Sequence, residues 1–108
     1  MFENIGSRFK RVPTYTTDQM IQIISEEAPK HHIRSVYFKT DSPDGIITKK
    51  DSLEIYVVSN GQMGYLDFGT FMKHLIDTLN RNAHYYACDS KTDESELRNE
   101  GATLAYTA

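Results

Sequence analysis

The stretch VYFKTDSPDGIITKKDSLEIYVV, residues 36–58, decides the fold. It holds two apolar runs, 36–38 and 53–58, separated by a polar loop that contains Pro43 and Gly45. Short runs of β-branched and aromatic residues bounded by turn formers are typical of strands. We therefore predict two neighbouring strands, 33–39 and 52–59, whose polar ends form a place for a ligand.

A helix is predicted ahead of these strands. Thr16 and Gln19 have the spacing of a capping box, and apolar residues at helical spacing follow. Pro29 sets the end of this helix, because the residue before a proline avoids helical backbone angles. Residues 1–15 are expected to form an irregular N-terminal arm.

A second helix is predicted after the strands. The Asn60-Gly61 pair predicts a tight turn, with 62–66 as its return strand. A helix over 69–81 comes next, and its apolar stripe comprises Phe68, Phe71, Met72, Leu75, Ile76 and Leu79. We expect Leu75, at the centre of the stripe, to be buried against the sheet.

The C-terminal third predicts a strand over 85–88, a charged helix over 91–100 and an edge strand over 102–106. Gly101 stands where a helix cap is expected. The fold class is therefore α+β (α/β-like), with a single mixed β-sheet of about four to five strands and two to three helices packed on it. We expect one domain, 1–108, with the core over 16–106.

Composition narrows the function classes. The formal net charge of −3 makes nucleic acid an unlikely partner. Cys88 is the single cysteine, no charged-then-apolar leader opens the chain, and no apolar run is long enough to span a membrane. A soluble cytoplasmic protein without a membrane partner is expected. The seven tyrosines favour a half-buried interface, so a homodimer is one expectation.

The order of elements resembles the minimal nucleotidyltransferase domain of the DNA-polymerase-β-like superfamily, over roughly 16–106. The segments that carry the resemblance are IRSVYFKT (33–40), DSLEIYVV (51–58), FMKHLIDTLNRNAHYYACD (71–89) and ELRNEGATLAY (96–106). In that family a strand ending in Gly-Ser precedes a strand bearing Asp-x-Asp, and a later strand carries a third acidic residue. The resemblance implies a nucleotidyltransferase-like sheet.

The motif positions depart from that family. Lys39 and Thr40 stand at the Gly-Ser position, and Ser52 and Glu54 stand at the Asp-x-Asp position. Tyr86 takes the place of the third acid, with Asp89 at the end of the same predicted strand. The resemblance therefore implies a degenerate site whose vestigial catalytic positions are Ser52, Glu54 and Asp89. It also implies nucleotide contacts from Lys39, Thr40 and Ser42, and metal ligands Glu54 and Asp51.

Mg²⁺ binds hard anionic oxygens in near-octahedral geometry, and phosphoryl transfer depends on the metal for positioning and charge neutralisation. A serine in the Asp-x-Asp pair therefore predicts loss of catalysis. We expect no cofactor, with Mg²⁺ only if the site is active. The leading hypothesis is a non-catalytic domain that binds a nucleotide or a partner protein.

Two alternatives stay open. One is a small homodimeric interaction module without a ligand, and the other is an active transferase that uses Glu54, Asp51 and Asp89 in shifted positions. Glu54 also has a plain structural interpretation, as the solvent-facing residue of an alternating strand. His31 and His32 are adjacent, so their side chains diverge, and a zinc site is not expected.

Overall fold

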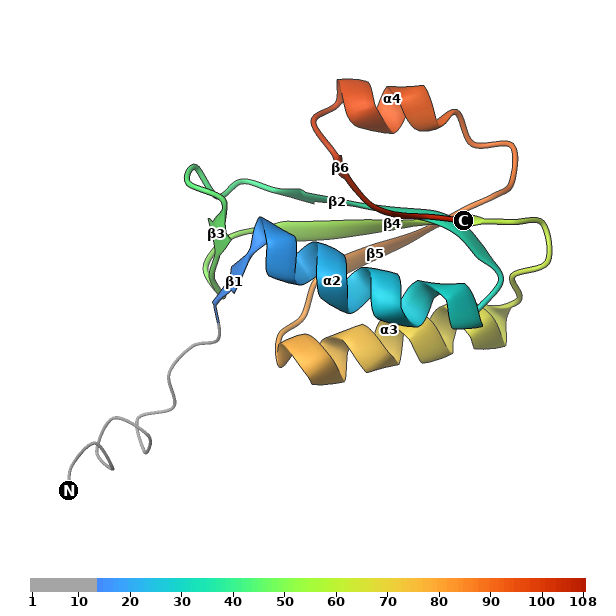
Figure 1. The fold of residues 1–108 in the computed structure, drawn as a ribbon, viewed down its shortest axis with the longest axis horizontal. Coiled ribbons are helices and arrows are strands. Elements are labelled where there is room, and N and C mark those ends of the chain that lie inside the picture. The colour runs from blue at the N-terminus through green and yellow to red at the C-terminus, as the bar shows by residue number, and fades with distance from the viewer. Residues whose placement is uncertain (1–13) are drawn as a thin grey trace.

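A computed structural model describes residues 14–108, and its centre is a four-stranded mixed sheet (Figure 1). Helices α2 and α3 cover one face of the sheet, and α4 lies over the other. The strand order is β5-β4-β2-β6, and only the β4–β5 pair is parallel. The strands are β2 (Ile33–Thr40), β4 (Leu53–Ser59), β5 (His84–Cys88) and β6 (Thr103–Thr107). The α+β class with a four-stranded mixed sheet is confirmed.

Helix α2 (Thr17–Glu27) begins and ends at the residues that the sequence indicates. The Gln19 amide donates to Thr16 Oγ1 at 3.2 Å, and the Thr16 amide donates to Gln19 Oε1 at 2.9 Å. This reciprocal pair satisfies two amides that have no partner within the helix. Pro29 lies in the 3-10 turn η1 (Ala28–Lys30) that ends the helix.

Helix α3 (Tyr65–Leu79) begins four residues before its predicted start, so the predicted return strand over 62–66 is wrong. Asp67 Oδ2 accepts from the Gly64 amide at 3.0 Å, and this cap starts the helix. The pairing of β4 with β5 is parallel, and parallel neighbours need a crossover rather than a tight hairpin. Gly61 still turns the chain, with φ of 103°.

A two-stranded ribbon was not predicted. In it β1 (Tyr15–Thr16) pairs with β3 (Ile46–Ile47), and β3 lies within the predicted polar loop. Tyr15 also donates its hydroxyl to the Leu79 carbonyl at 3.1 Å, so the end of the predicted arm is bound to the core. The rest of that arm, residues 1–13, lies outside the described residues.

The main core lies between the sheet and helices α2 and α3. Leu75 is fully buried there, as predicted, beside Met20, Ile24, Phe38, Ile55 and Phe71. A second, smaller core lies under α4 (Glu94–Asn99), where Leu97 packs on Tyr37 and Val58. Among residues 14–108, no helix combines the length and apolarity needed to cross a membrane.

Gly101 ends α4 as the sequence indicates. Its φ is 94°, its amide donates to the Arg98 carbonyl, and the Ala102 amide donates to the Leu97 carbonyl. These two bonds form a Schellman motif, which requires a left-handed residue at this position. Helix α4 packs over Tyr37 and Val58 on one half of this face of the sheet, whereas His84 and Tyr86 on the other half are exposed.

Candidate functional site

The open half of the sheet carries a compact group of polar and aromatic side chains. Lys39 on β2 lies opposite Glu54 on β4, and Glu54 lies opposite His84 on β5. Two residues further along each strand, Tyr56 lies opposite Tyr86. Alternate residues of a strand point to the same face, so these side chains share the face on which α4 lies. We call the group Lys39, Glu54, Tyr56, His84 and Tyr86 the tyrosine face.

Two tyrosine rings form a flat platform on this face. The Tyr56 and Tyr86 rings stack with centroids 5.0 Å apart and an angle of 17° between their planes. Tyr56 is half-buried, whereas Tyr86 keeps 43% of its surface exposed on the edge strand. An exposed ring in a fixed orientation offers a planar ligand a stacking surface at low entropic cost.

Glu54 is bound to this platform. Its Oε1 atom accepts the Tyr56 hydroxyl at 2.6 Å. This hydrogen bond to the Glu54 carboxylate, together with burial, raises the pKa of the Tyr56 phenol. A carboxylate has more acceptor sites than one phenol uses, so Glu54 can still accept a hydrogen bond from a ligand.

Helix α4 closes one side of the tyrosine face. Tyr37 donates its hydroxyl to Glu94 at 2.7 Å, and the Arg34 guanidinium donates to the same carboxylate at 2.8 Å. Burial and the Glu94 carboxylate raise the pKa of Tyr37. The Arg98 guanidinium lies 5.7 Å from the centre of the Tyr37 ring, a cation–π distance. These contacts hold α4 beside the face.

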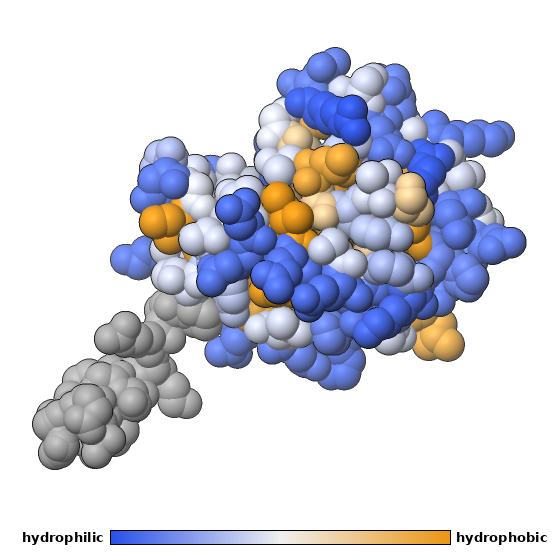
Figure 2. Space-filling view, viewed as in Figure 1, coloured by the Kyte–Doolittle hydropathy of each residue, from blue (hydrophilic) through white to orange (hydrophobic). Residues whose placement is uncertain are grey.

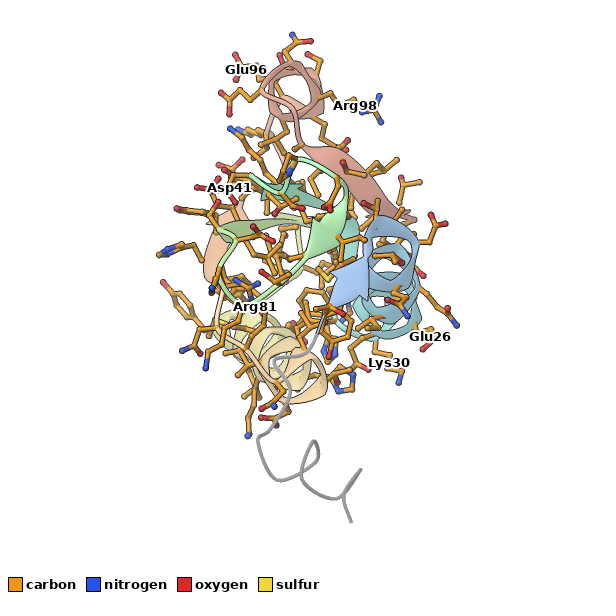
Figure 3. The ribbon with its side chains drawn as sticks, turned by 90° about the vertical axis from the view of Figure 1, so that its left-hand side faces the viewer. Glu26, Lys30, Asp41, Arg81, Glu96 and Arg98 are labelled. Carbon is orange, nitrogen blue, oxygen red and sulfur yellow. The ribbon has the colours of Figure 1, made fainter. Side chains whose placement is uncertain are left out.

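A hollow of about 180 Å³ opens where β4 and β5 begin, next to Ser52 and His84. Arg81 lines it and donates to the Thr48 carbonyl and, at 2.9 Å, to the Asp51 carbonyl. Figure 3 looks onto this end of the sheet, with Arg81 on the α3 side and Asp41 on the side of α4. The Arg81 guanidinium therefore stabilises the turn over 48–51 through these hydrogen bonds.

Most of the residues predicted as site residues gather at this end of the sheet. Lys39 and Glu54 are cross-strand neighbours, and the Ser52 amide donates to Asp41 Oδ1 at 2.8 Å. Asp89 does not join them. It comes directly after Cys88, which pairs with Val58, so it lies about 16 Å along the sheet from the row that contains Glu54. Ser52, Glu54 and Asp89 therefore do not converge on one cleft.

Several predicted ligand groups have local structural partners. Thr40 Oγ1 accepts from the Ser42 amide at 3.2 Å, and the Ser42 hydroxyl lies 2.7 Å from the Ile46 carbonyl, to which it donates. Asp51 Oδ2 accepts from the Thr48 amide at 2.8 Å, and Asp89 Oδ1 accepts from the Lys91 amide at 2.9 Å. Within 14–108, no three His, Cys, Asp or Glu side chains lie where they could hold a metal ion together.

Sequence reasoning missed the parts played by Tyr56, His84 and Tyr86. The available signal was the alternation of Glu54 and Tyr56 on one strand and of His84 and Tyr86 on another. That signal identifies faces, but only the parallel register places the two pairs side by side.

No family model, curated protein or solved structure matches this chain.

Proposed function

We propose that this chain is a binding domain of nucleotidyltransferase-like design that holds a nucleotide without transferring it. The observation that carries the proposal is the stacked, part-exposed Tyr56–Tyr86 pair next to Glu54 and Lys39 on an open sheet face. A nucleobase stacks on the exposed Tyr86 ring, because every base has a planar π-face. Glu54 accepts from the amino groups at the edge of the base.

Lys39 supplies the charge that a nucleotide phosphate needs. Its side chain is half-buried on β2, and no acidic group lies within 4.0 Å of its ammonium among residues 14–108. An ammonium on a flexible stem binds phosphate as a point charge. Lys39 and Tyr86 lie on either side of Glu54 and Tyr56, so one nucleotide spans the face.

The side chains available for a metal ion favour nucleotide binding over nucleotide transfer. The row that would correspond to the metal-binding row of a transferase holds Lys39, Glu54 and His84, with Ser52 beside it. Lys39 carries a positive charge that repels a cation and His84 offers a nitrogen ligand, whereas Mg²⁺ prefers carboxylate and water oxygens. The shifted arrangement of Glu54, Asp51 and Asp89 is disfavoured by the distance of Asp89 from that row.

Calorimetric titration with nucleoside mono-, di- and triphosphates, with and without Mg²⁺, tests the proposal. We expect saturable binding that Tyr86→Ala abolishes and that does not require Mg²⁺. Tyr65→Ala is the matched control, since Tyr65 is 98% exposed on α3, away from this face. Absence of binding by all three phosphate classes would overturn the proposal. Binding that Tyr86→Ala leaves intact would place the nucleotide elsewhere.

A transfer assay separates binding from catalysis. Labelled triphosphate is incubated with the chain, with Mg²⁺ and with protein and RNA acceptors. We expect no covalent label above a chain-free blank. Label that Glu54→Gln removes would establish the active-transferase alternative instead. Capture of a protein through the same face, lost in Tyr86→Ala, would identify a partner protein as the ligand.

A further inference from the structure

Strand β5 presents an open edge. It pairs with β4 on one side, and no described strand pairs with its other side. Its five residues, HYYAC, contain no proline, lysine or acidic residue, and its pairing with β4 runs without a bulge. His84, Tyr86 and Ala87 are exposed. A regular edge of this kind offers a row of unpaired backbone groups to another strand.

The opposite edge of the sheet is protected. Strand β6 pairs with β2 through a register shift at Val36 and Tyr37, which marks an irregularity in the strand. Helix α2 also packs against β6. In Figure 1, α4 lies above β6 and α2 lies below it, and Figure 2 gives the same view with the residues coloured by hydropathy. Bulges and covering helices are the devices by which natural sheets block edge pairing.

We propose that β5 pairs antiparallel with β5 of a second copy of this chain, about a two-fold axis at Tyr86. With a two-fold axis at Tyr86, a residue that lies n positions before Tyr86 faces the residue n positions after Tyr86 in the second copy. Tyr86 then faces Tyr86 of the second copy, Tyr85 faces Ala87, and His84 faces Cys88. The two four-stranded sheets join into one.

The residue pairs that this register creates favour a second copy as the occupant. No like charges face each other, and the large Tyr85 lies opposite the small Ala87. On the other face, Tyr86 extends the Tyr56–Tyr86 stack across the axis. The strand also supplies about four to six backbone hydrogen bonds between the copies. Each Tyr86 ring then covers the outer face of the other, so the second copy and a nucleobase compete for that ring face.

A cysteine variant tests the register directly. In the proposed dimer His84→Cys faces the native Cys88 of the other copy, with Cα atoms about 4.5–5.5 Å apart, which a disulfide can bridge. Within one copy the same residues lie about 13 Å apart along the strand, so no internal bond can form. Oxidised glutathione is the oxidant. It takes the two electrons and two protons of each thiol pair and leaves as two reduced molecules.

We expect His84→Cys to form a covalent dimer on a non-reducing gel, and the parent chain to sediment as a dimer. Thr107→Cys is the matched control, because it also places a second cysteine at an exposed position, but on the protected β6 edge, and should not cross-link beyond the parent. Ala87→Lys should give a folded monomer, since an edge lysine opposes strand pairing. Its circular dichroism should match that of the parent.

A parent chain that sediments as a monomer overturns the proposal. A dimer that survives Ala87→Lys, or that fails to cross-link in His84→Cys, places the interface away from β5 and also overturns it. Nucleotide titration of the Ala87→Lys monomer keeps the two proposals separate. Its Tyr86 ring has no second copy to cover it, so a monomer that binds no nucleotide counts against the proposed function alone.

Discussion

The buried carboxylate of Glu27 lies 2.8 Å from the Nε2 atom of His31, one helical turn away. Lys30 and His74 also face Glu27, at 3.2 Å and 3.4 Å, so the carboxylate joins α2 to α3. Burial raises the pKa of Glu27, but the hydrogen bonds from His31 and Lys30 and the charges of His74 and Lys30 outweigh it and hold the pKa below its usual value of 4.5.

Glu27→Gln should lower the free energy of unfolding by about 1–3 kcal/mol near pH 7, because it removes a buried charge from paired donors. A lowered carboxyl pKa stabilises the fold above the unfolded pKa of 4.5 and loses that effect as pH falls through the folded pKa. The difference in the free energy of unfolding between Glu27→Gln and the parent should therefore become smaller at acidic pH. Urea unfolding across that range measures it.

Glu26→Gln is the control for this comparison. Glu26 is exposed on the same helix, and its Oε2 accepts from Gln22 at 3.3 Å. Its effect should stay within about 0.5 kcal/mol. An equal loss in the two variants, or a Glu27→Gln deficit that does not change with pH, would contradict a role for the buried carboxylate.

Leu75→Ala should cost about 2–5 kcal/mol, because Leu75 is fully buried at the centre of the main core. Thr70→Ala, exposed on the same helix, should change the stability little. Thermal and urea unfolding of both variants measure the difference. A midpoint unchanged in Leu75→Ala would show that the helix does not depend on this contact.

Two glycine variants should shift the stability in opposite directions. A Cβ atom added at Gly69 or at Gly101 meets nothing within 4 Å. The backbone conformation at each position therefore determines the effect of an alanine on stability. Gly101→Ala should cost about 1–2 kcal/mol, because φ is 94°. Gly69→Ala, within α3, should add about 0.5–1 kcal/mol. Denaturant melts of the pair test this, and shifts of the same sign would refute it.

Added carboxylates should create a metal site only where the strand register brings them together. Ser52→Asp with Glu54→Asp, with or without His84→Asp, should lower the stability in chelator and gain stability in Mg²⁺ or Mn²⁺. The gain is about 2.7 kcal/mol when metal stands at a hundred times its dissociation constant. Thermal shifts with metal and with chelator measure it.

Asp89→Asn is the control in this series, since Asp89 lies away from the row that contains residues 54 and 84. Adding it to the double variant should leave the metal response unchanged. A metal-dependent shift already present in the parent and lost in Glu54→Gln would mean that the natural residues hold the ion, and the proposal of a non-catalytic domain would fail.

The two tyrosine hydroxyls on either face of the sheet predict a further contrast. The Tyr85 hydroxyl is buried without a hydrogen-bond partner among the described residues, whereas the Tyr37 hydroxyl donates to Glu94. Tyr85→Phe should therefore be neutral or stabilising, and Tyr37→Phe should cost about 1–3 kcal/mol. Urea unfolding compares them, and a larger loss in Tyr85→Phe would contradict the assignment of partners.

Sequence patterns predicted the features that depend on interactions within a single helix. The Thr16–Gln19 capping box, the Gly101 cap and the burial of Leu75 each depend on spacing within one helix. The β1–β3 ribbon was missed, because strands of two residues exist only through tertiary pairing. The return strand was predicted wrongly, because the Asn60-Gly61 pair marks a change of chain direction without specifying whether a strand or a helix succeeds it.

The candidate site was predictable only in part, for the same reason. Lys39, Ser52 and Glu54 were predicted from the family resemblance, and the antiparallel register of β2 and β4 places Lys39 opposite Glu54. The separation of Glu54 from Asp89 depends on the register between β4 and β5, which the α3 crossover and the core packing set. No pattern within either strand contains that register. The distance between Glu54 and Asp89 therefore could not be predicted from the sequence alone.

The pairing of β6 with β2 sets the order in which the sheet can be completed. Thr107 lies beside Ser35, although the whole of β4, α3 and β5 intervenes in the chain. During synthesis on the ribosome, β2 therefore emerges long before the strand that covers its outer edge. Closing so long a loop is slow, and an unpaired edge is prone to aggregate while it waits. Chaperone demand for this chain should consequently fall sharply once 103–107 have been translated and released.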